Sequence, residues 1–144
     1  MAKVAVVYWS GTGNTQKMAE AVVEGAKGAG AEVECFEVDS FSVDQIDSFD
    51  GLALGCPSMG AEELEEGSYE PFFAAAVDSG KLSGKPVVLF GSWGWGAGAW
   101  METWSERTKE AGANLVDTFI VENEPDDEGL EGSKKLGAAI AGAC

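Results

Sequence analysis

The chain has 144 residues, a length that suits one domain whose core is large enough to fold without disulfide bonds or a structural metal. Its 25 acidic residues outnumber its 9 basic ones and give a net charge of −16, so nucleic acid and anionic membranes are poor partners and a basic protein surface is a good one. Because histidine is absent, any catalytic triad, metal site or proton shuttle that depends on histidine is excluded.

Apolar runs typical of buried strands alternate with helical patterns along the whole chain. We expect strands at residues 4–7, 33–38, 52–54, 87–90 and 115–121, with helices at residues 18–26, 43–49, 71–77, 100–108 and from residue 130 onward. Such β–α units with short connections predict an α/β fold, a doubly wound parallel sheet with helices on both faces, formed by residues 1–144 as a single domain. Ligands of these folds bind beyond the carboxyl ends of the strands, so we expect four loops to meet there, at residues 10–15, 56–69, 92–98 and 122–127.

The first of these loops is rich in groups that bind phosphate. Gly11 and Gly13 allow the backbone to curl so that several N–H groups point inward, and the following helix adds the positive end of its dipole. Side-chain donors come from Ser10, Thr12, Asn14 and Thr15. No Lys or Arg lies between Trp9 and Gln16, which favours a phosphate ester held by neutral donors. The spacing fits neither a Walker loop nor a dinucleotide fingerprint, which leaves a mononucleotide site or an ordinary strand-to-helix turn with a polar cap.

The loop after the fourth strand places Trp93 and Trp95 among three glycines, Gly94, Gly96 and Gly98. Large aromatic side chains in such a loop bury well only against a flat surface, so they favour an aromatic ligand. Met59, in the loop after the third strand, offers a thioether for the opposite face of that ring. Trp100 and Trp104 are different, because their spacing on a helix places them in the core.

The three cysteines, Cys35, Cys56 and Cys144, are far apart and lack a C-x-x-C spacing. A zinc site or iron–sulfur cluster held by cysteines needs about four ligands, so both are excluded. The start of the chain shows no signal-peptide core, and no apolar stretch is long enough to cross a bilayer. We therefore expect a reduced, metal-free, cytoplasmic protein.

Three motifs together resemble flavodoxins of the short-chain type known from anaerobic bacteria. They are Ser10-Gly-Thr-Gly-Asn-Thr15, Met59-Gly-Ala-Glu62 and Ser92-Trp-Gly-Trp-Gly96, and the likeness extends over nearly the whole chain. The resemblance implies a three-layer flavodoxin-like sandwich with strand order 2-1-3-4-5 and noncovalently bound FMN. It also implies a low-potential one-electron carrier, not an enzyme, which uses the semiquinone/hydroquinone couple and works in place of ferredoxin.

The same resemblance assigns individual residues to FMN. Trp95 would stack on one face of the isoalloxazine and Met59 on the other, while Glu62 would meet the N3 edge. The Gly94 amide would bind a pyrimidine oxygen, and Ser92 or Asn123 the ribityl chain. The full set comprises the phosphate-binding residues Ser10, Gly11, Thr12, Gly13, Asn14 and Thr15, together with Trp9, Pro57, Ser58, Met59, Gly60, Ala61, Glu62, Ser92, Trp93, Gly94, Trp95, Gly96 and Asn123. Ala61, Trp93 and Ala97 depart from the residues that are more familiar at their positions.

Two hypotheses concern redox chemistry and partners. The Gly60–Ala61 peptide could turn its carbonyl toward the N–H that one-electron reduction creates at flavin N5, because Gly60 can adopt positive φ. Clustered carboxylates should disfavour full reduction of FMN and dock basic patches of reductases and acceptors, with the protein a monomer, although solubility alone would also explain the charge. The clusters comprise Glu62, Glu63, Glu65, Glu66 and Glu70 in one loop region and Glu122, Glu124, Asp126, Asp127, Glu128 and Glu131 in another.

An FMN-dependent NAD(P)H or quinone reductase is the alternative function. It would need room for a nicotinamide nucleotide, whose phosphates the acidic loops would repel. A receiver domain of the same fold should end its third strand in Asp, whereas Gly55 and Cys56 stand there. A low-molecular-weight phosphatase needs Cys-x5-Arg, and the position of that arginine, counted from Cys56, holds Glu62. Cys56 is therefore expected to be a small packing residue.

Overall fold

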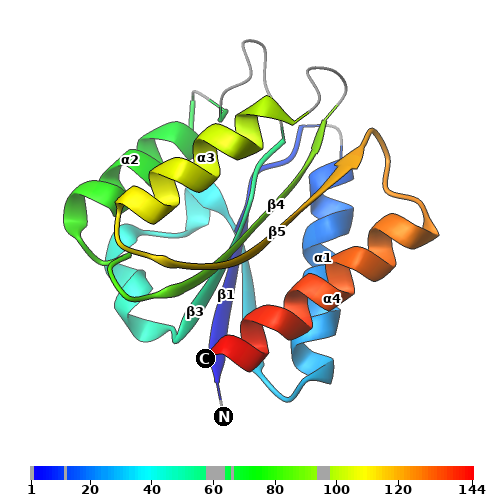
Figure 1. The fold of residues 1–144 in the computed structure, drawn as a ribbon, viewed down its shortest axis with the longest axis horizontal. Helices are drawn as coiled ribbons and strands as arrows, with labels where there is room; N and C mark the ends of the chain where they lie inside the picture. The colour runs from blue at the N-terminus through cyan, green and yellow to red at the C-terminus, as the bar shows by residue number, and fades with distance from the viewer. Residues whose placement is uncertain (1, 12, 58–63, 66, 94–97) are drawn as a thin grey trace.

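A five-stranded parallel sheet forms the middle layer of the protein (Figure 1). The computed structural model describes residues 2–11, 13–57, 64–65, 67–93 and 98–144. The strands lie in the order β2-β1-β3-β4-β5, which confirms the expected topology. Their bounds are β1 Lys3–Tyr8, β2 Glu32–Glu37, β3 Gly51–Gly55, β4 Pro86–Trp93 and β5 Asn114–Glu122.

Helices cover both faces of this sheet, as the alternation of strand and helix patterns predicts. On one face lie α1 (Asn14–Gly28) and α4 (Asp127–Ala143), and on the other α2 (Tyr69–Ser79) and α3 (Ala99–Glu110), as Figure 1 shows. Two short 3₁₀ helices, η1 (Val38–Ser40) and η2 (Val43–Ser48), precede β3. Within the part of the chain that the structure describes, no helix is long and apolar enough to cross a membrane.

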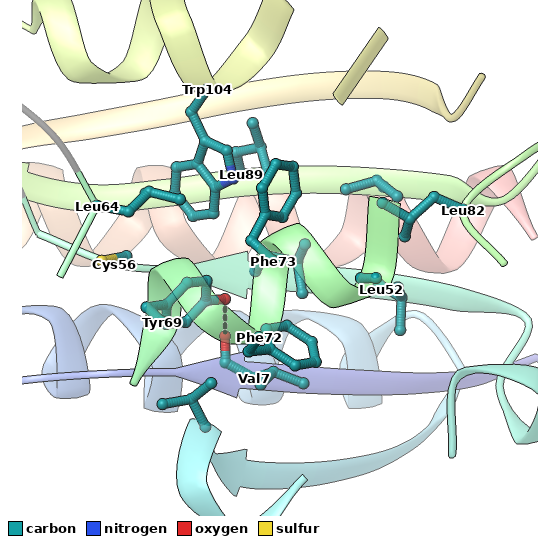
Figure 2. Packing of buried hydrophobic residues seen from close by; sticks show 14 of the residues in the cluster. Val7, Leu52, Cys56, Leu64, Tyr69, Phe72, Phe73, Leu82, Leu89 and Trp104 are labelled. Carbon is teal, nitrogen blue, oxygen red and sulfur yellow. Dashed lines mark hydrogen bonds between the residues drawn. The ribbon is translucent and has the colours of Figure 1, made fainter. Parts of the chain in front are cut away.

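Each central strand contributes side chains alternately to two separate cores. In β1, Val4 and Val6 pack beneath α1 and α4, whereas Ala5 and Val7 pack beneath α2 and α3. Burial on both faces explains why these strands read as continuous apolar runs in the sequence. Trp104 is 1% exposed and lies among Phe73, Leu89 and Leu64 in the second core (Figure 2), and Trp100 is likewise 1% exposed, which confirms both tryptophans as core residues.

Several elements are longer than the sequence pattern predicts. The expected fourth strand ends at Phe90, but β4 continues through Ser92 and Trp93 because these residues stay paired with Val121 and Glu122 of β5. The predicted loop 92–98 therefore begins inside a strand.

The helices also begin earlier than expected. Asn14 and Thr15 belong to the first turn of α1 instead of to a loop. In α2, Pro71 is the third residue, because a proline in the first turn loses no hydrogen bond within the helix. The last helix begins at Asp127, not at Leu130, and the predicted helix at 43–49 is a 3₁₀ helix.

Candidate cofactor site

The chain after β1 folds back sharply and enters α1 through a glycine. The Trp9 N–H donates to the Gly55 carbonyl (3.0 Å), and the Gly13 N–H donates to Ser10 Oγ (3.0 Å). Gly13 occupies the N-cap position with φ of +94°, a conformation that costs glycine little and other residues more. The alternative of a helix capped by a polar side chain at this position is therefore wrong.

The N-terminus of α1 differs electrostatically from those of the other α-helices. Its first turn carries no acidic residue, whereas the first turns of α2, α3 and α4 contain Glu70, Glu102 and Asp127 respectively. Acidic side chains favour helix N-termini because they compensate the positive end of the dipole. At α1, in a chain of net charge −16, no acidic side chain of its own first turn compensates that end, which suits an anionic ligand.

Two buried hydroxyl groups from distant parts of the chain meet beside this helix end. Thr15 in α1 is 1% exposed and Ser92 in β4 is 5% exposed. Their oxygen atoms are 3.5 Å apart, which is long for a hydrogen bond between hydroxyls, so the contact between them is weak. A weak contact between two buried hydroxyls favours a further polar partner at this point.

The end of β3 is tied to β4 and α3 through Cys56. The Cys56 N–H donates to the Phe90 carbonyl (3.1 Å), and the Cys56 carbonyl accepts from Trp100 Nε1 (3.2 Å). A side chain at Gly91 would place its Cβ 2.2 Å from that same carbonyl oxygen. Pro57, one of the predicted cofactor residues, follows immediately after this junction.

The end of β5 lies beside the end of β4 at the same edge of the sheet. The Asn123 N–H donates to the Trp93 carbonyl (2.7 Å), and Asn123 has φ of +57°, a left-handed conformation that asparagine tolerates better than most residues. Lys17 of α1 pairs with Glu124 at 3.0 Å. The expectation that four loops meet at one edge of the sheet is confirmed for the described residues.

The structure thus brings together ten of the predicted cofactor residues, at the carboxyl edge of the sheet. They are Trp9, Ser10, Gly11, Gly13, Asn14, Thr15, Pro57, Ser92, Trp93 and Asn123. The other predicted residues lie outside the described part of the chain, namely Thr12, Ser58, Met59, Gly60, Ala61, Glu62, Gly94, Trp95 and Gly96. The hypothesis of a peptide flip between Gly60 and Ala61 therefore stays a prediction.

Two residues of the acidic cluster after β3 make contacts within the protein. The Glu65 carboxylate accepts hydrogen bonds from backbone N–H groups at the start of α2. The Glu70 carboxylate pairs with both terminal nitrogens of Arg107, each at 2.7 Å. Neither contact could be predicted from the sequence, because the first depends on how α2 starts and the second on how α2 lies against α3.

Two buried titratable groups near the site are structural. Burial raises the pKa of the Cys56 thiol to about 12, so this cysteine is a neutral packing residue, as expected. Tyr69, which the sequence did not single out, is fully buried, and its hydroxyl donates to the Val7 carbonyl at 2.7 Å (Figure 2). Burial raises the pKa of Tyr69 well above its ordinary value. Among the described residues, no group of His, Cys, Asp and Glu side chains is arranged to hold a metal ion.

Comparison with known proteins identifies the family of this chain. The family model for flavodoxin matches residues 6–137. The chain belongs to the flavodoxin family. A flavodoxin from Megasphaera elsdenii is 48% identical over 97% of this chain and 99% of its own length, and one from Clostridium beijerinckii is 46% identical over 91% and 96%. The solution structure of the two-electron reduced Megasphaera elsdenii flavodoxin matches with a TM-score of 0.89, at 47% identity, over 96% of this chain and 98% of the other.

Flavodoxins bind FMN and transfer electrons, and the described edge fits that cofactor. The N-terminus of α1, approached through Gly13, offers backbone donors and a positive dipole end for a phosphate ester. The paired hydroxyls of Thr15 and Ser92 add neutral polar groups beside it. FMN is accordingly the cofactor of this flavodoxin.

Proposed function

We propose that this flavodoxin is a low-potential one-electron carrier that shuttles electrons between redox proteins in place of ferredoxin. The observation that supports this best is the N-terminus of α1, which has no acidic side chain in its first turn although the chain has a net charge of −16. Bound FMN supplies one-electron redox chemistry, and the working couple is the one between its one-electron-reduced and fully reduced forms. The protein is not itself an enzyme.

In this proposal each loop has its own task toward FMN. Ser10, Gly11, Gly13, Asn14 and Thr15, with Thr12, hold the phosphate through neutral donors. Ser92 or Asn123 serves the ribityl chain, since both lie at the ends of neighbouring strands joined by the Asn123–Trp93 hydrogen bond. Trp95 and Met59 contact the two faces of the flavin ring in this proposal, as the resemblance to flavodoxins implies.

The low potential follows from electrostatics. A unit negative charge about 10 Å from an added electron costs roughly 1.7 kcal/mol at an effective dielectric constant of about 20. Since a tenfold change in an equilibrium constant corresponds to about 59 mV for one electron, each such carboxylate lowers the potential by roughly 70 mV before salt screens it. The bound phosphate adds to this effect.

The partners in this proposal are reductases and acceptors with basic surfaces, and the protein acts as a monomer. Its net charge of −16 steers such partners toward it and makes the encounter depend on salt. The related flavodoxin from Megasphaera elsdenii has been solved in its two-electron reduced state, which supports a redox cycle for this chain as well.

Potentiometric titration at increasing ionic strength tests the proposal. We expect the second one-electron couple to lie well below that of free FMN and to rise as salt screens the carboxylates. We also expect no steady oxidation of NADH or NADPH by the protein alone. A potential that ignores salt, or sustained turnover of NAD(P)H, would contradict the carrier function and favour a reductase.

A further inference from the structure

The start of α2 is held by a carboxylate that lies four residues before the helix. Glu65 Oε1 accepts hydrogen bonds from the N–H groups of Ser68 (2.7 Å) and Tyr69 (3.0 Å), and its Oε2 accepts one from Gly67 (2.7 Å). The first N–H groups of a helix have no partner within it, so a single side chain satisfies several donors here. Bonds from N–H groups to a carboxylate are stronger than those between neutral groups.

Gly67 is the residue that lets this carboxylate come so close. A Cβ at position 67 would lie 2.8 Å from Glu65 Oε2, so any side chain there would displace the carboxylate. Gly67 does not appear among the residues with positive φ, and its backbone conformation therefore does not itself require glycine. The close approach is what an alanine at this position would disturb.

The backbone of Glu65 is anchored as well. Its N–H donates to Cys56 Sγ at 3.4 Å, within the longer limit for sulfur acceptors. Cys56 is completely buried and is itself fixed by bonds to Phe90 and Trp100. The chain that leaves β3 at Cys56 thus returns to the same point at Glu65.

The cap also connects to the strand that leads into the phosphate loop. Tyr69 donates its N–H to Glu65 and its hydroxyl to the Val7 carbonyl of β1 at 2.7 Å. Val7 directly precedes Tyr8, the last residue of β1. The Glu65 carboxylate is therefore connected, through Tyr69, to the strand that leads into the loop at residues 10–15.

We propose that Glu65 is a positioning residue for FMN, because its carboxylate holds the start of α2, from which the Tyr69 hydroxyl reaches the Val7 carbonyl of β1. This inference rests on the proposed function, which assigns the residues after β1 to the FMN phosphate. Without this carboxylate, FMN binding would have to order the start of α2 and its contact with β1, and the cost of that ordering would appear as weaker affinity.

Calorimetric titration of the apoprotein with FMN tests this role, at a temperature where circular dichroism shows each variant to be folded. We expect Glu65→Ala to raise the dissociation constant at least about tenfold. Gly67→Ala, which moves the carboxylate without changing the charge, should raise it about threefold or more. Asp50→Asn is the matched control, because the Asp50 carboxylate also accepts a backbone bond (Lys3 N–H, 2.9 Å) but lies beside the first residue of β3, at the opposite edge of the sheet. It should change the affinity by less than about twofold.

Two results would overturn the inference. In one, Glu65→Ala lowers thermal stability but leaves the FMN affinity of the folded protein unchanged, which would make Glu65 a helix cap only. In the other, Glu65→Ala weakens FMN binding and Gly67→Ala does not, which would assign the weaker binding to the lost charge of Glu65 and not to the position of its carboxylate. Failure of the proposed function is distinguishable from both, since it would appear in the redox potentials of the unaltered protein and not in these affinity ratios.

Discussion

Gly91 and Cys56 lie so close together that a side chain at position 91 has no room. The Cβ of any other residue would stand 2.2 Å from the Cys56 carbonyl oxygen and 3.1 Å from the Trp100 ring. Gly55 is equally constrained, since its Cβ would lie 2.3 Å from the ring of Phe90. The ends of β3 and β4 therefore meet at the site only because glycine occupies both positions.

Gly91→Ala should accordingly destabilise the protein. The obstacle is backbone, which cannot move away as the end of a flexible side chain can, so we expect a loss of about 1–3 kcal/mol in the free energy of unfolding. Urea denaturation of the apoprotein measures it. Gly28→Ala is the control, because no packing neighbour among the described residues lies within 4 Å of a Cβ at that position in α1. Equal effects of the two substitutions would show that the close approach does not matter.

The buried thiol of Cys56 should make the free energy of unfolding depend on pH. Burial raises its pKa from 9.0 to about 12, so the unfolded chain releases this proton at a lower pH than the folded protein does. The stability that the neutral thiol contributes is fully present below about pH 9 and is lost as the pH rises toward about 12, by up to about 1.4 kcal/mol per pH unit. Cys56→Ala should flatten the decline of unfolding free energy with pH over this range. Parallel curves for the variant and the unaltered protein would contradict the assignment.

At the scale of elements, α2 and α3 lie side by side and are joined by one well-formed ion pair. Arg107 of α3 contacts Glu70 of α2 with two bonds of 2.7 Å and lies 4.8 Å from the centre of the Phe73 ring. Tyr69 and Trp104 meet edge to face beneath it, with ring centres 5.7 Å apart. These contacts hold α2 against α3, the helices that follow the loops after β3 and β4.

The Arg107–Glu70 pair should show a measurable coupling energy. Both side chains are about a third exposed, so solvent screens the pair, and we expect only about 0.5–1 kcal/mol in a double-mutant cycle of Arg107→Gln and Glu70→Gln. Arg107→Lys should lose most of it, because lysine cannot form the two parallel bonds. The pair between Lys134 and Glu24, 3.8 Å apart and more exposed, is the control and should show almost none. Similar coupling in both pairs, or none in the first, would refute the prediction.

For the whole molecule, the doubly wound parallel sheet and the meeting of four loops could be predicted from alternating apolar and helical patterns, whereas the strand order is implied only by the resemblance to flavodoxins. The extension of β4 through Trp93 could not, because it depends on pairing with β5 after Gly91, a residue that usually ends a strand. The inward contacts of Glu65 and Glu70 could not be predicted either. A glutamate in an acidic run looks like a surface charge until the helix start and the neighbouring Arg107 are placed around it.

The net charge of −16 should make electron transfer to basic partner proteins depend on salt. The rate of electron transfer to a basic haem protein such as cytochrome c should fall about tenfold or more as sodium chloride is raised from low to physiological concentration and above, since salt screens the attraction. Stopped-flow absorbance measures this rate. A small neutral quinone is the control acceptor and should show little dependence on salt. A rate to the basic protein that is equally insensitive to salt would exclude electrostatic docking.

Stepwise reduction of the purified, FMN-loaded protein with dithionite, followed by its visible spectrum, shows whether this chain binds FMN and passes electrons one at a time. We expect a yellow oxidised form that turns blue after the first electron and bleaches after the second. A protein that cannot be loaded with FMN, or one that bleaches in a single step without a blue form, would contradict this expectation.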